Sequence, residues 1–276
     1  MLYFRSMIVF SNAKINLGLY VTEKRSDGFH NIETCFYPVD WVDVLEINES
    51  STLVFESVGI PIPGNSDDNL CLKAYHLLKK DFDLPPVSIH LLKNIPMGAG
   101  LGGGSSNASF TLKALNGLFN LGISNNILVK YAAQLGSDCP FFIHNRSMLA
   151  FGTGDEFKDI EIDLSDKKIM LVYPSIHIST SQAFANIMPR KPAIYIASVL
   201  QSPVDEWRRM SLINEFELSI FKIEIEMIKK KMYEDGAEFA LMSGSGSTVF
   251  GIFDGDFDFG KLEAYFLKKG YLCKVV

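Results

Sequence analysis

The order of apolar and polar positions along this chain predicts a mixture of strands and helices. Residues 7–21 are rich in β-formers and partly alternate between apolar and polar side chains, which predicts a pair of strands crossing the core. Residues 41–54 continue this strand pattern, and residues 87–95 predict one further strand. Residues 67–80 open on Asp-Asp-Asn, which is typical of the cap of a helix.

The second half of the chain predicts strands and helices in the order of a split β-α-β layer. The expected elements are a strand at 168–173, helices at 179–187 and 214–234, strands at 239–242 and 248–253, a helix at 260–269 and a strand at 271–276. The long charged helix has apolar positions at Phe216, Ile220, Ile223 and Met227. With extra helices inserted, the order β-α-β-β-α-β is that of a ferredoxin-like fold.

Charged and turn residues from Gly152 to Asp166 separate the two halves. We therefore expect an N-terminal domain over residues 7–155 and a C-terminal domain over residues 156–276. The first six residues, MLYFRS, resemble the remains of an engineered protease site, and they lack the long apolar core of a signal peptide. The natural chain is expected to begin at Met7.

Composition narrows the class of protein. A chain of 276 residues with 47% hydrophobic and 21% charged residues is typical of a soluble protein with one large or two modest cores. A net charge of −6 argues against sequence-independent binding of nucleic acid. No uncharged apolar run approaches the length of a membrane span. No extended apolar heptad requires a dimer, so we expect a monomer without an obligatory protein partner.

The four cysteines do not form a recognisable metal or redox motif. Cys35, Cys71, Cys139 and Cys273 are scattered, with no CxxC pair and no histidine cluster at zinc spacing. They are typical of reduced thiols, which predicts a cytoplasmic protein.

The clearest candidate for chemistry is the segment IPMGAGLGGGSSNAS at residues 95–109. It holds five glycines between Gly98 and Gly104 and continues directly into a helical pattern. Glycines let backbone N–H groups turn toward a ligand, and a helix N-terminus adds orphan donors and a positive dipole end. The segment therefore predicts a phosphate site. The alternative is a flexible turn in which Ser105 or Ser106 caps the helix.

Other phosphate-binding motifs fit this segment poorly. A GxGxxG is present at residues 98–103, but no Asp or Glu occurs from Leu84 to Ser137, where a dinucleotide fold needs an acidic residue for the ribose. The Gly-Lys-Ser/Thr triplet of a P-loop is absent. Asp258-Phe259-Gly260 lacks the His-Arg-Asp and Val-Ala-Ile-Lys sequences of protein kinases, so we interpret it as a chance tripeptide.

Lys14 and Asp138 are the charged side chains that could act beside this loop. Lys14 lies in an apolar strand, where it either protects an edge or points into a site. Asp138 either caps a helix or faces a partly apolar site. A phosphate loop, a strand lysine and an aspartate are together the parts of a phosphoryl-transfer site. The string Ser11-Asn12-Ala13-Lys14 also matches the SxxK of acyl-serine enzymes, although no KTG follows and SxxK there needs a helix.

Two further turns could contact a substrate. In residues 24–31, Phe29 offers a stacking face and His30 a donor and an acceptor, which would suit a nucleobase as well as an ordinary loop. Residues 243–247, Ser-Gly-Ser-Gly-Ser, could form a plain hairpin or let backbone approach a phosphate.

Three stretches in this order resemble the motifs of the GHMP small-molecule kinases: AKINLGL at Ala13, PMGAGLGGGSSNAS at Pro96 and MSGSGSTVFG at Met242. The resemblance covers nearly the whole chain from Met7. It implies an α+β GHMP kinase fold with a mixed α/β nucleotide-binding N-terminal domain and a ferredoxin-like split β-α-β C-terminal domain. Asn12 stands where the family usually has proline, which changes local stiffness and leaves the roles intact.

Within that superfamily, DGFHNIET and GSDCPFF resemble the kinases whose substrate carries a cytidine diphosphate group. This implies phosphorylation of a 2-hydroxyl with ATP and Mg²⁺ in non-mevalonate isoprenoid biosynthesis. The resemblance implies Lys14 and Asp138 as the catalytic pair, with Ser106 as the magnesium ligand. The implied ATP-binding residues are Pro96, Met97, Gly98, Ala99, Gly100, Leu101, Gly102, Gly103, Gly104, Ser105 and Ser106. The implied substrate-binding residues are Asn16, Phe29, His30, Phe184, Gly244 and Ser245.

The expected reaction is direct in-line transfer of the γ-phosphoryl group of ATP. Asp138 would accept or orient the hydroxyl proton, and Lys14 would keep that carboxylate ionised. Three alternatives stay open: another GHMP kinase acting on a mevalonate derivative or homoserine, a non-catalytic ATP-binding sensor on the same fold, and the acyl-serine enzyme.

Overall fold

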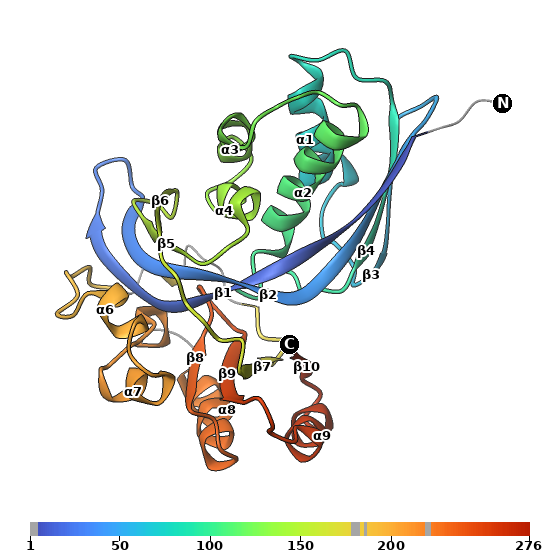
Figure 1. Cartoon of the computed structure of the whole chain (residues 1–276). Coiled ribbons are helices and arrows are strands. Elements are labelled where there is room, and N and C mark those ends of the chain that lie inside the picture. The colour runs from blue at the N-terminus through green and yellow to red at the C-terminus, as the bar shows by residue number, and fades with distance from the viewer. Residues whose placement is uncertain (1–4, 178–182, 185–186, 219–221) are drawn as a thin grey trace. The chain divides into compact units, whose positions relative to one another are not determined.

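The computed structural model describes residues 5–177, 183–184, 187–218 and 222–276 (Figure 1). The described chain forms two compact units. Unit 1 contains the residues up to Ala13, Asp40–Met97 and Gly102–Arg146; unit 2 contains Lys14–Val39, Gly98–Leu101 and Ser147–Val276. The two long N-terminal strands each contribute to both units, so the units are not continuous in sequence. The predicted division between residues 155 and 156 stays a prediction.

Unit 1 packs helices against a sheet. Its elements are the first part of β1 (Ser6–Lys24), the second part of β2 (His30–Glu49), β3 (Val54–Gly59), the 3₁₀ turn η1 (Ser66–Asp68), α1 (Leu70–Lys79), β4 (Val87–Lys93), α2 (Gly103–Leu118), α3 (Asn125–Ala133) and α4 (Cys139–His144). Strand β4 pairs parallel to β3 and antiparallel to β2, and α1 lies beside α2 (Figure 1). Alternate β4 residues Val87, Ile89 and Leu91 are buried in one core with both helices.

The cap that the sequence predicts before α1 is present. Asn69 is the N-cap residue, and its side chain accepts a hydrogen bond from the backbone N–H of Cys71. The preceding Asp67 and Asp68 belong to η1, which is capped in turn by Asn65. The predicted strand at 87–95 and the helix that follows the glycine loop are also confirmed.

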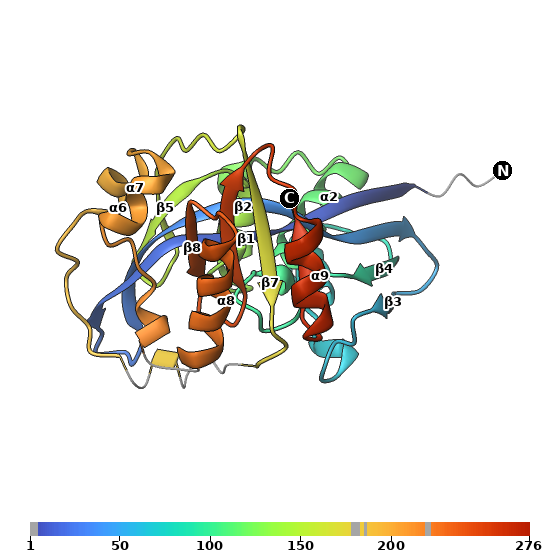
Figure 2. The same cartoon turned by 90° about the horizontal axis from the view of Figure 1, so that it is seen from below.

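Unit 2 contains the second sheet. Beside parts of β1 and β2 it holds β5 (Met148–Phe151), β6 (Glu156–Asp159), β7 (Lys167–Tyr173), α6 (Ile196–Leu200), α7 (Val204–Arg209), the 3₁₀ turn η2 (Glu215–Leu218), α8 (Lys222–Glu234), β8 (Phe239–Met242), β9 (Val249–Asp254), α9 (Gly260–Lys268) and β10 (Leu272–Val275). The antiparallel order β10-β7-β9-β8 is that of the predicted ferredoxin-like layer, which is confirmed. Figure 2 shows α8 and α9 on one face of this sheet.

Several local predictions were wrong. Residues 7–21 form one continuous strand, β1, and not a pair of strands. The predicted helix at 214–234 begins as the turn η2, and its α-helical part α8 buries Ile225 and Ile228, whereas Ile223 and Met227 are 78% and 46% exposed. The helix has two apolar stripes. Ile225, Ile228 and Met232 form the buried stripe, and Ile223 and Met227 belong to the exposed one.

Other elements lie outside what the pattern predicted. The short strands β5 and β6 and the helices α6 and α7 are additions to the predicted order. The predicted helix at 179–187 lies largely outside the described residues. Among the described residues, no helix is long and apolar enough to cross a membrane.

A buried ion pair organises unit 1 at the end of β4. Lys93 Nζ donates to Asp43 Oδ2, and both side chains are fully buried. Asp43 Oδ1 also accepts the backbone N–H groups of Asn94 (2.7 Å) and Ile95 (2.8 Å), and Asn107 Nδ2 on α2 donates to Asp43 Oδ2 at 2.9 Å. Burial is the main influence on Lys93 and lowers its pKa, while Asp43 opposes that effect. One carboxylate therefore fixes the chain just before the glycine loop and the helix just after it.

We predict that Asp43→Asn lowers the free energy of unfolding by about 3–5 kcal/mol, because it leaves the Lys93 ammonium buried without its counter-charge. Denaturant titration of the purified chain measures this loss. The matched control is Glu56→Gln, since Glu56 forms an exposed pair with His90 on the same sheet (3.3 Å). That control should cost less than about 1 kcal/mol. Equal losses in the two variants would contradict the role of the buried pair.

Candidate active site

The glycine loop has backbone conformations that require glycine. Gly98, Gly100 and Gly102 have φ values of +61°, +78° and +68°, in the left-handed region. Gly102 is the N-cap residue of α2, which has neither a side-chain cap nor an acidic residue in its first turn. Ser105 therefore lies inside the first turn, and the alternative that it caps the helix is wrong. The positive end of a 16-residue helix follows the loop directly, which is the arrangement that favours an anion.

In unit 2, residues 98–101 of the loop are held by backbone hydrogen bonds. The N–H of Lys14 donates to the carbonyl of Leu101 (3.0 Å), and the N–H of Thr248 donates to the carbonyl of Ala99 (3.2 Å). Ser243 Oγ donates to the carbonyl of Gly100 at 2.9 Å. The motif from Met242 onward thus supports this loop as well as forming the predicted hairpin between β8 and β9.

Lys14 is buried and points into unit 2. Its side chain is 4% exposed, Nζ donates to Asn16 Oδ1 at 2.6 Å, and Nζ lies 4.8 Å from the centroid of the Phe36 ring. The alternative of a water-facing edge lysine is therefore wrong. The N–H of Asn16 donates to Ser243 Oγ (3.2 Å), and Asn16 Nδ2 donates to Thr34 Oγ1 (2.9 Å). Asn16 consequently joins the lysine to the serine that holds the glycine loop.

Gly244 and His177 also lie close to residues 98–101. A Cβ on Gly244 (φ +55°) would be 3.2 Å from the Gly100 carbonyl oxygen and 3.4 Å from Asn16 Oδ1. The next residue, Ser245, is partly buried in the same turn. A Cβ on Gly98 would be 2.8 Å from two ring atoms of His177, whose exposed imidazole the sequence pattern did not indicate.

In unit 1, the start of α2 presents an unsatisfied hydroxyl. Ser106 Oγ is buried and has no hydrogen-bond partner among the residues that the structure describes. Buried hydroxyls normally have a partner, so this oxygen fits a site for a cation or a phosphate. Beside it, a Cβ on Gly103 would be 2.9 Å from both Lys93 Nζ and a methyl group of Ile95. The described residues contain no group of three or more His, Cys, Asp or Glu that could hold a metal.

Asp138 occupies the N-cap position of α4 without capping it. Its backbone is in the αR region (φ −80°, ψ −15°) and its side chain makes no capping hydrogen bond. The residues Cys139, Phe141 and Phe142, which follow it, are fully buried, and Asp138 itself is partly exposed. The cap interpretation is therefore wrong, and the carboxylate stays a candidate for chemistry.

Ser11 does not have the setting of an acyl-serine nucleophile. It lies in strand β1, where an SxxK motif would need a helix. Its side chain is fully buried, and its Oγ donates to the Asp43 carbonyl and accepts from Asn107 Nδ2. The acyl-serine alternative is wrong.

A small cavity in unit 1 opens beside Gly104 at the start of α2. Its volume is about 150 Å³. The cavity is lined by Ile62, Pro63, Asn65, Asp68, Asn69, Leu70, Lys93, Met97, Gly104 and Asn107. The sequence pattern indicated only capping roles for the polar residues before α1, so most of this lining was missed.

Phe29, His30 and Phe184 of unit 2 are the residues expected to bind a nucleobase, and two of them are in contact. The rings of His30 and Phe184 stack with centroids 4.7 Å apart and an interplanar angle of 14°. Phe184 also packs edge-on against Phe216 at 4.9 Å. Phe29 is 66% exposed, in a turn where its N–H donates to Asp27 Oδ1 at 3.0 Å. Burial, followed by the charge of Lys24, lowers the pKa of His30, which favours the neutral imidazole near pH 7.

Comparisons with known proteins cover both halves of the chain. The model "GHMP kinases N terminal domain" matches residues 69–146, and the model "GHMP kinases C terminal" matches residues 196–271. A protein from Cytophaga hutchinsonii is 51% identical over 251 residues, which is 90% of this chain and 93% of the relative. One from Bacteroides thetaiotaomicron is 50% identical over 254 residues, 90% of this chain and 92% of the relative. Both are named 4-diphosphocytidyl-2-C-methyl-D-erythritol kinase.

Solved kinase structures also match this chain. A crystal structure of 4-(cytidine 5'-diphospho)-2C-methyl-D-erythritol kinase matches with a TM-score of 0.82 at 29% identity and covers 98% of each chain. A homoserine kinase from Cytophaga hutchinsonii matches with a TM-score of 0.72 at 16% identity, over 100% of this chain and 96% of that one, which is a likeness of fold alone.

We predict that Gly100→Ala destabilises the protein more than φ strain alone can explain, because its Cβ would lie 2.0 Å from the Ser243 carbonyl oxygen. The matched control is Gly270→Ala in the same unit, which has nearly the same φ (+79°) and nothing within 4 Å. Strain in the left-handed region should cost the control about 1–2 kcal/mol, and Gly100→Ala should cost clearly more in denaturant unfolding. Equal losses would mean that Ser243 is not held against the loop.

Proposed function

We propose that this chain, which belongs to the GHMP kinase family, transfers the γ-phosphoryl group of ATP to the 2-hydroxyl of 4-diphosphocytidyl-2-C-methyl-D-erythritol. It is an ATP-dependent small-molecule kinase, and its GHMP kinase fold agrees with the sequence expectation. The choice of substrate rests on sequence identity: two relatives named 4-diphosphocytidyl-2-C-methyl-D-erythritol kinase are 51% and 50% identical to this chain over 90% of its length. The reaction belongs to non-mevalonate isoprenoid biosynthesis, and we propose a cytoplasmic monomer.

The nucleotide is bound by residues 96–106 and the cavity beside them. Backbone N–H groups of the glycine loop and the N-terminus of α2 counter the charge of the phosphates. The cavity of about 150 Å³ holds the base: Ile62, Leu70 and Met97 supply apolar surface, and Asn65 supplies polar groups.

Magnesium accompanies ATP in this proposal. Ser106 supplies an oxygen ligand, since its buried Oγ is unpartnered among the described residues and oxygen is the ligand type that Mg²⁺ prefers. The ion, when bound, neutralises charge on the phosphate oxygens during transfer.

Lys14 and Asp138 are the proposed catalytic pair. The substrate hydroxyl oxygen forms a bond to the γ-phosphorus as the bond from that phosphorus to the oxygen of ADP breaks. Asp138 orients the hydroxyl and receives its proton, and the ammonium of Lys14, oriented by Asn16, stabilises charge on the transferring group. Because such transition states are loose, positioning contributes more than early proton removal.

The cytosine ring is read by Phe29, His30 and Phe184. A neutral imidazole can pair with one group on the edge of cytosine: its N–H can donate to N3, or its bare nitrogen can accept from the amino group. Phe184 already stacks on His30, and the exposed ring of Phe29 supplies a second apolar face. Asn16, Gly244 and Ser245 complete the proposed substrate site.

The direct test is magnesium-dependent ADP release with 4-diphosphocytidyl-2-C-methyl-D-erythritol, beside mevalonate, phosphomevalonate and homoserine under the same conditions. Release with the cytidyl substrate alone supports the proposal. Release with another acceptor would keep the kinase and reject the role of Phe29 and His30. Nucleotide binding without release for any acceptor would favour an ATP-binding sensor.

We predict that Phe29→Ala raises KM for the cytidyl substrate by about 5- to 100-fold, because it removes one base-stacking face. The KM for ATP should stay unchanged. Steady-state kinetics with each substrate varied in turn measures both values. Tyr265→Ala on α9, which removes a partly exposed ring elsewhere in unit 2, is the control and should change neither KM. An unchanged KM for the cytidyl substrate in Phe29→Ala would reject the stacking role.

A further inference from the structure

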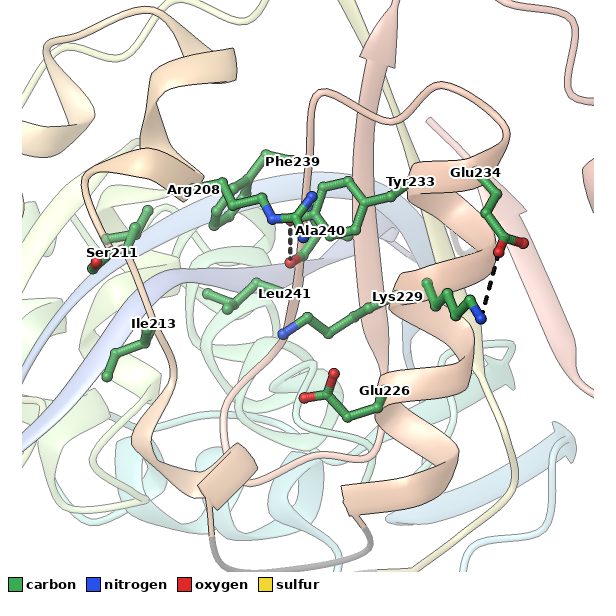
Figure 3. Close-up of a pocket in the computed structure, with 12 residues that line it drawn as sticks. Arg208, Ser211, Ile213, Glu226, Lys229, Tyr233, Glu234, Phe239, Ala240 and Leu241 are labelled. Carbon is green, nitrogen blue, oxygen red and sulfur yellow. Dashed lines mark hydrogen bonds and ion pairs between the residues drawn. The ribbon is translucent and has the colours of Figure 1, made fainter.

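Strand β8 lies at the edge of its sheet, and side chains satisfy its outer backbone groups. Tyr233 Oη accepts from the N–H of Ala240 (3.0 Å) and donates to its carbonyl (3.2 Å), beside a cavity of about 650 Å³ (Figure 3). Met242 lies two residues after Ala240 on the same strand, and its N–H donates to Glu217 Oε1 at 2.6 Å. Lys229, which lines the same cavity, pairs with Glu217 at 2.6 Å. The strand that leads into the Ser243 turn is thus fixed along its free edge.

Asn214 extends this support beyond the strand into the turn itself. Asn214 is only 1% exposed, and its Nδ2 donates to the carbonyls of Met242 (2.8 Å) and Gly244 (2.7 Å). These two carbonyls flank Ser243. Asn214 Oδ1 accepts the N–H of Phe216 at 3.0 Å, which fixes the orientation of the amide. One carboxamide therefore uses both donors on the turn and its acceptor on its own segment.

The same segment is aligned with the strand that carries Lys14. Asn214 forms an isolated parallel bridge with Leu19 of β1, whose N–H donates to the carbonyl of Ile213 at 2.9 Å. From the turn, Ser243 Oγ accepts the N–H of Asn16, and Asn16 Oδ1 accepts from Lys14 Nζ. Hydrogen bonds, together with the backbone on either side of Ser243 and the side chain of Asn16, thus connect Asn214 to the amine of Lys14 through buried residues.

We propose that Asn214 is a positioning residue for phosphoryl transfer, which acts by fixing Ser243 and through it Asn16 and Lys14. This inference rests on the proposed function, because it takes Lys14 as a catalytic residue. Asn214 touches neither substrate nor nucleotide in this account. Its loss would therefore disturb the geometry of the transfer step more than the binding of either substrate.

The test compares Asn214→Asp and Asn214→Ser with Glu215→Gln. Asp keeps an oxygen for the N–H of Phe216 and has no donor for the turn. Ser also keeps an oxygen but has a single O–H on a shorter side chain, which cannot replace both donors to the turn. Glu215 is the neighbouring buried residue, which accepts from the N–H of Val21 (2.6 Å) and pairs with Arg190 (3.0 Å); both of these partners lie outside the turn. Each purified variant is compared with wild type by melting temperature, steady-state kinetics and hydrogen exchange of the amides of residues 243–248.

Both Asn214 variants should lower kcat by about 10- to 100-fold, with KM for ATP and the cytidyl substrate within about threefold of wild type. Exchange at residues 243–248 should rise by about tenfold or more, whereas Glu215→Gln should change the melting temperature without either effect. Unchanged kcat in folded Asn214→Ser, or an equal kcat loss in Glu215→Gln, would overturn the inference. If Asn214→Asp does not fold, kcat and hydrogen exchange of Asn214→Ser alone test the inference. Wild type without turnover would reject the proposed function, and the exchange data would still decide whether Asn214 fixes the turn.

Discussion

Burial of the Lys14 ammonium is the constraint on which unit 2 depends. An ammonium group removed from water is unfavourable unless acceptors replace its hydration, and Asn16 Oδ1 together with the face of Phe36 meets part of that need. The neighbouring strand residues Ala13 and Ile15 are fully buried, so the strand cannot turn the lysine outward without exposing them. Asn16 Oδ1 must then face the lysine, while the backbone N–H of the same residue donates to Ser243 Oγ. The demand of a single buried charge thus extends through neutral hydrogen bonds to a turn more than 200 residues away in sequence.

Unit 1 also buries an ammonium group, that of Lys93, and compensates its charge with an ion pair. The Asp43 carboxylate compensates the Lys93 ammonium and also accepts the N–H groups of Asn94 and Ile95, which precede the glycine loop. Each unit therefore holds its own part of the loop region by a buried charged group and its partners. The glycines between these attachments have left-handed φ values, which suit the phosphate-binding role proposed for the loop. Catalysis through a loose phosphoryl-transfer transition state depends mainly on position and charge.

Sequence reasoning succeeded where the signal was local. The strand at 239–242 and the ferredoxin-like order followed from apolar runs bounded by turn residues, and the cap at Asn69 followed from its side-chain chemistry. The buried face of α8 was mispredicted because Ile223 and Ile225 begin two competing apolar stripes, and only tertiary packing selects one. Asn214 was missed for a related reason: it read as the first residue of a charged helix, and its partners lie about 30 residues away. The family resemblance supplied the roles of Lys14 and Asp138, which stay predictions, while the structure describes the surroundings of each.

The central claim is that Lys14 and Asp138 act in one phosphoryl-transfer step. A double-mutant cycle with Lys14→Met and Asp138→Asn, read as the single-turnover rate constant at saturating MgATP and cytidyl substrate, tests it most directly. Residues that serve one transition state are strongly non-additive, so the double variant should be about as slow as the slower single variant. If the two losses instead multiply, the residues act independently, and the proposed catalytic pair would be contradicted.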